Sequence, residues 1–308
     1  MGSYVLQRIL WIVPVMLAVA IVTFALMHQV PGGPWDGAKR LSPQALENVN
    51  REYGLDQPVW EQFGRYMLGL AKGDLGVSFY QGNRPVRDVL TDGIRVSATL
   101  GLLALALSTA FGVTLGVLSA LKRNSVLDYL AVGFATAGAS VPSFILGMLL
   151  LVLFTAHLHW LPSGGWGSPE QAIMPVLALS AWPGAYIARV TRASMLDVMQ
   201  QEYVRTARAK GLGERVVVWR HTLRNALIPV LTVIGPVAAM LVTGSFIVEE
   251  LFAIPGIGRA FVSSIGNRDY GVIMGTTLFY TFIIATANLT VDVLYAAVDP
   301  RIRYGAHG

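Results

Sequence analysis

The stretch ILWIVPVMLAVAIVTFALMHQV, residues 9–30, decides the fold class because it contains no Asp, Glu, Lys or Arg. A helix of about 20 apolar residues is long enough to cross the hydrocarbon core of a bilayer. The run is longer than the apolar part of a typical secretion signal, and no small-residue cleavage site follows it. We therefore expect a retained membrane-spanning helix.

The composition of the whole chain is that of a membrane protein. Hydrophobic residues make up 54% of the 308 residues, charged residues make up only 13%, and the mean hydropathy is +0.56. The chain has no Cys, and its 32 Gly and 15 Pro follow no triplet repeat, which excludes disulfide-stapled and collagen-like classes. We attribute the net charge of +5 to Lys and Arg retained on the cytoplasmic side, and not to nucleic-acid binding.

Further apolar runs of spanning length follow the first, so we expect an all-α membrane protein with six transmembrane helices. The expected helices cover residues 9–30, 96–121, 130–154, 172–196, 227–252 and 272–298. Gly138 and Pro142 interrupt the third run, and Pro175 and Pro183 lie within the fourth.

The distribution of charge predicts the orientation. With both termini in the cytoplasm, the inner segments carry 13 basic and five acidic residues, whereas the outer loops carry ten basic and 12 acidic residues. Basic residues gather on the cytoplasmic side of membrane proteins. We therefore expect a multi-pass protein with both termini in the cytoplasm, forming a single transmembrane domain over residues 1–308.

The outer segment between the first two spans, residues 31–95, is expected to be partly helical. Ser42 and Pro43 are typical of a helix start and Gly54 of a helix end. A second helix is predicted by apolar residues that recur every three or four positions up to Gly73. We expect this stripe to lie on the bilayer surface or on other outer segments; its residues are Val59, Trp60, Phe63, Tyr66, Met67 and Leu70.

The longest inner connection, residues 197–226, holds six of the 13 inner basic residues. It predicts two short helices, Gln201–Lys210 and Glu214–Asn225, separated by glycines. Ala207 and Ala209 are small, so the backbone of another protein can approach the first helix. A solvated basic loop beside anionic membrane lipid is the alternative that these residues leave open.

The string EYVRTARAKGL, residues 202–212, resembles the EAA loop of ATP-binding-cassette importer permeases when taken with Arg220-His221 and RNALIP, residues 224–229. It is most similar to the dipeptide, oligopeptide and nickel branch of that family. Further matching motifs extend the resemblance over nearly the whole chain: residues 30–32, 55–58, 73–76, 255–259, 267–270 and 299–301. With Gly211 set on the glycine of the loop, its acidic position falls on Arg205. Gly271 stands where that branch often has Pro.

The resemblance implies one half of a pore in a prokaryotic cell membrane. The implied partners are a second homologous permease, expected to make a heterodimer, two cytoplasmic ATPases and an external substrate-binding protein. ATP and Mg²⁺ would bind to the ATPases and no cofactor to this chain, which lacks a G-x-x-x-x-G-K-[ST] phosphate loop. The loop residues that would couple to the ATPases are Glu202, Arg205, Thr206, Ala207, Arg208, Lys210, Gly211 and Leu212. The implied substrate is a di- or oligopeptide, with nickel or sugar as alternatives.

The substrate pathway is expected at small residues and helix breaks of the third and fifth spans, because close helix packing and cavities both use them. These candidates are Ser140, Pro142, Ser143, Gly235, Ala239 and Thr243. Asn288 and Asp292, four apart in the last span, are further candidates. Ordinary helix packing, and for Asp292 an interhelical hydrogen bond, are the structural alternatives.

Two other classes of protein are less well supported by the sequence. A membrane-embedded enzyme needs a nucleophile with a base or a metal cluster, and no H-E-x-x-H or G-x-S-x-G motif is present. An ion-driven secondary transporter typically has ionisable residues near the midplane, where only Asp292 is available. Copurification of ATPase subunits distinguishes these classes from an importer permease.

Overall fold

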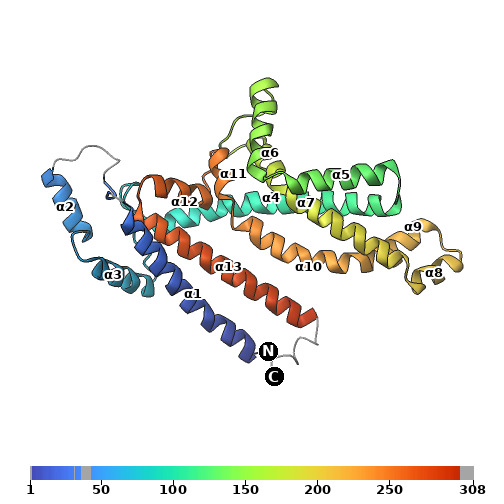
Figure 1. Ribbon diagram of the computed structural model, residues 1–308, viewed down its shortest axis with the longest axis horizontal. Coiled ribbons are helices and arrows are strands. Elements are labelled where there is room, and N and C mark those ends of the chain that lie inside the picture. Colours follow the sequence, from blue (N-terminus) through green and yellow to red (C-terminus); the bar gives the residue numbers. More distant parts are fainter. Residues whose placement is uncertain (1, 31, 36–42, 299–308) are drawn as a thin grey trace. The chain divides into compact units, whose positions relative to one another are not determined.

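The computed structural model describes residues 2–30, 32–35 and 43–298, and these are helical apart from short loops and one small hairpin (Figure 1). The elements, in order, are α1 Gly2–Gln29, α2 Pro43–Tyr53, α3 Val59–Ala71, β1 Val77–Ser78, β2 Arg84–Pro85, α4 Val86–Leu121, α5 Val126–Ser140, α6 Ser143–Leu150, the π-helical turn η1 Leu151–His157, α7 Pro169–Met199, α8 Glu202–Ala209, α9 Glu214–Val216, the π-helical turn η2 Val217–Thr222, α10 Leu223–Val242, α11 Phe246–Leu251, α12 Ile257–Gly266 and α13 Tyr270–Val298.

The all-α membrane fold is confirmed, with one change in the third span. Five helical stretches within the described residues are long and apolar enough to cross a membrane, and a bent pair brings the number to six if it is one span. The five stretches are Gln7–Gln29, Val86–Leu121, Pro169–Met199, Glu214–Val242 and Tyr270–Thr290. The fourth predicted span, with its two internal prolines, is therefore an unbroken helix.

The prediction of one helix over residues 130–154 is wrong. Figure 1 shows α6 leaving the line of α5, and the angle between the two arms is 103°. Pro142 has no backbone N–H and disfavours a helical conformation at the residue before it. Val141 accordingly has an extended backbone, with φ −89° and ψ 120°.

The fifth predicted span also has different bounds. The expected separate helix at Glu214–Asn225 is wrong, because α9, η2 and α10 run on without a break to Val242. The helix then ends early, since Gly244 takes the left-handed backbone (φ +90°) that suits glycine. Ser245 begins the separate α11 by accepting a hydrogen bond from the Val248 N–H at 3.4 Å.

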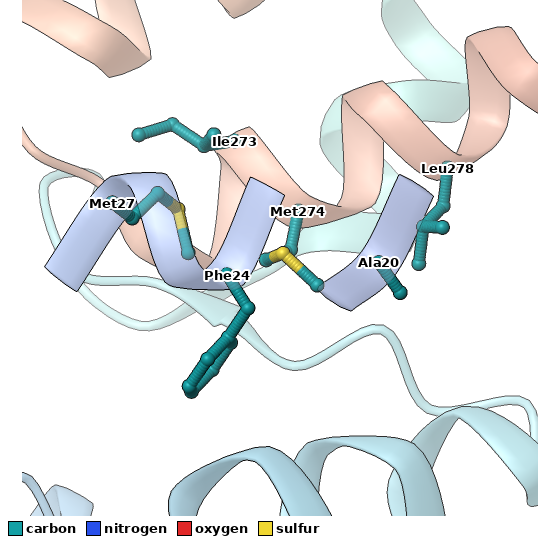
Figure 2. Close-up of a cluster of buried hydrophobic side chains, with 6 residues drawn as sticks. All are labelled: Ala20, Phe24, Met27, Ile273, Met274 and Leu278. Atoms are coloured by element: carbon teal, nitrogen blue, oxygen red, sulfur yellow. The ribbon is translucent and has the colours of Figure 1, made fainter. Parts of the chain in front are cut away.

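The contacts divide the chain into two compact units, residues 1–97 with 255–308 and residues 98–254. In the first unit α1 and α13 lie side by side (Figure 1). Figure 2 shows the buried side chains between them: Ala20, Phe24, Met27, Ile273, Met274 and Leu278. This cluster is the core on which the outer segment is built.

The apolar stripe of α3 packs on this core, which corrects the expectation that it lies on the bilayer surface or on other outer segments. Four of its six members contact the cluster between α1 and α13: Phe63, Tyr66, Met67 and Leu70. The other two, Val59 and Trp60, are exposed. The predicted C-terminal ends of α2 and α3 are confirmed, because Gly54 and Gly73 follow them with φ +64° and +82°, while Ser42, the predicted start of α2, lies outside the described residues.

The hairpin of β1 and β2 is held against the start of α13. β1 and β2 pair antiparallel, and the buried Asp269 carboxylate accepts hydrogen bonds from the Ser78 hydroxyl and from the Phe79 N–H at 3.1 Å. A Cβ on Gly271 would lie 2.1 Å from the Val77 carbonyl oxygen. Only glycine fits at position 271 without a shift of the hairpin.

We expect Gly271→Ala to destabilise the first unit by about 1–3 kcal/mol, because the added methyl group collides with the hairpin backbone. Thermal unfolding of the purified protein, with proteolysis of residues 72–85 as a local readout, measures this loss. The control is Gly266→Ala, whose Cβ meets no atom within 4 Å. Equal melting temperatures and cleavage rates for the two variants would contradict the close approach.

Candidate functional site

The helix predicted at the centre of the inner loop is α8, Glu202–Ala209. It ends at Lys210 and Gly211, and the Gly211 N–H donates to the Arg208 carbonyl at 2.9 Å. Gly211 has φ +78°, while a Cβ there would meet no atom within 4 Å. Position 211 therefore requires glycine for its backbone conformation and not for lack of space.

One face of α8 packs on its own chain. Val204 and Ala207 are buried beside Val217 of η2, with Val198 of α7 against them. The expectation that Ala207 offers a close approach to another protein is therefore wrong, because this small side chain lies on the inner face. Its role is to let α8 sit tightly on the end of α7 and on η2.

The opposite face of α8 is exposed and charged. The residues of the predicted coupling set on this surface are Glu202, Arg205, Thr206, Arg208 and Lys210, followed by Gly211 and Leu212 beyond the helix end. Arg205 pairs with Glu202 at 3.2 Å within the helix. The α8 helix thus presents a polar surface on a buried apolar base.

A second ion pair closes the turn after α8. The Arg208 guanidinium donates to both carboxylate oxygens of Glu214, at 2.8 and 3.2 Å, which raises the pKa of Arg208 above its usual value. The Asn225 amide donates to the Tyr203 hydroxyl at 2.8 Å, 22 residues along the chain. Together these contacts fix α8 to the start of the Glu214–Val242 helix, so the loop is a folded unit.

A cavity of about 540 Å³ lies where the third span bends. It collects four of the predicted pathway residues, namely Ser140, Pro142, Ser143 and Thr243. The break after α10 and the break between α5 and α6 open onto the same space. The sequence analysis did not predict that Trp182 and Pro183 of α7 line the cavity. The proline within that span was the one feature of the sequence that could have indicated them.

The lining of this cavity is uncharged. None of its 15 lining residues is Asp, Glu, Lys, Arg or His. The Ser140 hydroxyl donates to the Thr136 carbonyl at 2.8 Å, and the Thr243 hydroxyl donates to the Met240 carbonyl at 2.7 Å. These hydroxyls keep an acceptor lone pair toward the cavity, so the surface is mildly polar and carries no fixed charge.

The remaining pathway candidates lie elsewhere. Gly235 and Ala239 belong to α10 but do not line the cavity. Asn288 lines a separate cavity of about 340 Å³ in the first unit, with Arg8 and Trp11. The side chain of Asp292 lies outside the described residues.

We expect Gly211→Ser to loosen α8, because a residue with a Cβ costs about 1 kcal/mol in the left-handed conformation. The matched control is Gly213→Ser: Gly213 is also unobstructed, has φ −60° and is a helix N-cap, where serine is favoured. Hydrogen–deuterium exchange of residues 202–212 should be about fivefold faster in the first variant only. Equal exchange in both variants would show that φ at position 211 does not hold the helix end.

Comparison with known proteins gives family matches over most of the chain. Residues 112–304 match the family described as binding-protein-dependent transport system inner membrane component, and residues 1–101 match the N-terminal part of such components. The chain is similar to the dipeptide transport system permease protein DppB of Bacillus subtilis, with 41% identity over the whole of both chains.

Further similarities agree with that match. The oligopeptide transport system permease protein OppB of Salmonella typhimurium is 40% identical over 99% of this chain and 100% of the relative. A chain of the MetNI methionine ABC transporter, solved in inward-facing conformations, shares the fold with a TM-score of 0.56 and 20% identity over 68% of this chain and 96% of that one. The chain therefore belongs to the family of binding-protein-dependent transport system inner membrane components.

Proposed function

We propose that this chain is the pore-forming permease subunit of an ATP-driven importer that takes up di- or oligopeptides. The observation that carries this proposal is the full-length similarity to permeases named for dipeptide and for oligopeptide transport. As a permease subunit the chain is not an enzyme and has no cofactor of its own. Residues 1–308 act as one permease domain in this proposal.

The proposed complex contains a second homologous permease, two cytoplasmic ATPases that bind ATP and Mg²⁺, and an external substrate-binding protein. Membership of a binding-protein-dependent transport family supports these partners. The excess of basic residues on the inner segments supports cytoplasmic termini and a cytoplasmic α8. Residues 31–95 then lie outside and receive the binding protein. Cysteines placed at Gln81 and Lys210 test this topology. An impermeant thiol reagent applied to intact cells should label the cysteine at position 81 and not the one at position 210.

The charged face of α8 is the proposed contact with an ATPase. Arg205, Thr206 and Lys210 are exposed there, and the buried face with Ala207 fixes the helix to α7. When ATP closes the ATPase pair, a displacement of α8 would be carried by α7, which also lines the cavity through Trp182 and Pro183. Coupling requires that the ATP-bound and ATP-free transporters favour different conformations of the cavity, with a free-energy difference of a few kcal/mol.

The uncharged cavity supports a peptide as substrate. A peptide backbone is a polar, neutral chain, and a passage with hydroxyl groups but without fixed charges binds it weakly enough to release it. Specificity would then reside in the external binding protein. In this arrangement the permease supplies passage and the binding protein supplies selection.

A tryptophan that fills the cavity should block import. We expect Thr243→Trp to lower ATP-dependent uptake of labelled peptide by at least about tenfold in proteoliposomes containing the whole transporter, because a bulky indole would project into the cavity and obstruct a peptide there. Gly235→Trp is the control on the same helix, since its Cβ direction is open and it does not line the cavity. Import blocked by Gly235→Trp and spared by Thr243→Trp would place the pathway elsewhere.

Charge reversal tests the contact of α8 with the ATPase. We expect Arg205→Glu to reduce the ATPase retained on the purified permease by about fivefold, since an exposed charge contributes about 1 kcal/mol to an interface. The double variant Glu202→Arg with Arg205→Glu keeps the ion pair of 3.2 Å in reverse order. It should lose the ATPase as well. Retention by the double variant would mean that Arg205 only stabilises the helix.

A further inference from the structure

Asp128, in the first turn of α5, is the acceptor of a buried hydrogen-bond network that joins three segments of the second unit. Its carboxylate is bound by the Arg192 guanidinium of α7 through two bonds of 2.8 Å, from Nε to Oδ1 and from a terminal nitrogen to Oδ2. The Ser119 hydroxyl of α4 and the Asn124 N–H, the latter at 2.9 Å, complete the set. Asp128 is only 3% exposed, whereas the Arg192 side chain is 28% exposed, so the carboxylate is covered by its partners while the guanidinium still reaches water.

The ion pair of Asp128 and Arg192 joins residues that are much farther apart in the sequence than those of the other ion pairs on the inner side of this unit. Arg205 with Glu202 and Arg208 with Glu214 connect near neighbours, whereas Arg192 and Asp128 are 64 residues apart. Two parallel bonds from a planar guanidinium fix the orientation of the carboxylate as well as its distance. The pair therefore ties the beginning of α5 to one turn of α7.

The α5 helix packs on α7 near Asp128, where Ala131 and Ala135 are buried, and it borders a cavity farther along. A Cβ on Gly116 of α4 would lie 2.6 Å from the Ala188 carbonyl oxygen, so those two backbones are in direct contact. On α5, a Cβ on Gly138 would lie 3.4 Å from the Ala181 carbonyl oxygen of α7, which is an ordinary contact with room for the methyl group. An apolar cavity of about 410 Å³ is lined by residues of α5, including Phe134 and Gly138, together with residues of α4, α6 and α7. The α4 and α7 helices are thus in backbone contact, whereas the part of α5 around Gly138 borders an apolar cavity beside them.

The ion pair lies between the two candidate sites, which are α8 and the uncharged cavity. Arg192 is seven residues before the end of α7, after which α8 begins, and Trp182 of the same helix lines the uncharged cavity. Ser140, at the other end of α5, lines that cavity too, and 12 residues of helix place it roughly 18 Å from Asp128. A movement of α7 that accompanies α8 reaches the start of α5 through Arg192.

We propose that the ion pair of Asp128 and Arg192 makes α5, the inner arm of the broken span, follow the movement of α7 and α8. Asp128 is a positioning residue in this scheme and does not touch the substrate. The proposal rests on the proposed function, because import is the process that the movement drives. Breaking the pair frees α5 from α7, so ATP hydrolysis continues while Ser140 no longer moves with the coupling helix.

The test uses the whole transporter in proteoliposomes and measures peptide imported per ATP hydrolysed. Asp128→Asn should lower this ratio about tenfold and Arg192→Lys several-fold, since lysine keeps the charge but loses the two-bond geometry. Basal ATP hydrolysis should stay within about twofold of wild type in both. The control is Arg189→Lys, three residues earlier on α7, which should leave the ratio unchanged.

A distance measurement supplies a readout that does not require import. Because the chain has no cysteine, spin labels can be placed singly at Gly133 of α5 and Lys210 beyond α8. ATP should leave their distance distribution nearly unchanged in wild type, because α5 moves with α8, and should change it in Asp128→Asn, where α5 no longer follows. An unchanged import ratio and an unchanged distance response in Asp128→Asn would overturn the proposal, as would failure of both pair variants to assemble. A wild-type complex that keeps this distance constant during ATP hydrolysis but imports no peptide would instead overturn the proposed function.

Discussion

The constraint on which this structure depends is that a bilayer offers no water to backbone groups at a helix break. A break inside a span is tolerated only where it faces protein or an aqueous cavity. Two breaks, at Val141-Pro142 and at Thr243-Gly244, line the same cavity in the second unit. The cavity follows from the sequence, because a proline causes the first break and a glycine with a left-handed backbone causes the second.

The same unit combines rigid and loose packing. Glycines bring α4 and α7 into backbone contact at Gly116, whereas an apolar cavity separates parts of α5 from the surrounding helices. The apolar base of α8 is fixed to α7, so the polar face of the inner loop and the cavity share one rigid helix. In the proposed function, such an arrangement carries a displacement of α8 to the cavity, because tightly packed helices move as one body.

Much of this architecture could be predicted from the sequence, because charge-free runs of about 20 residues have few stable alternatives. The α8 helix and its end at Gly211 followed from helix propensity and a glycine stop. The bend at Pro142 was visible as an interruption, but its angle depends on packing against α7. The buried side of Ala207 and the ion pair of Asp128 with Arg192 could not be predicted, because both depend on contacts between segments far apart in the chain.

The central claim is that substrate passes through the cavity at the paired breaks. A single cysteine at Ser143, in this otherwise cysteine-free chain, tests it in the assembled transporter during ATP turnover. Transported peptide is predicted to slow the reaction of this cysteine with a soluble thiol reagent, while a cysteine at Gly235 reacts at the same rate with and without peptide. Labelling of Ser143→Cys that does not change with peptide, in a complex that is actively importing, would contradict the claim.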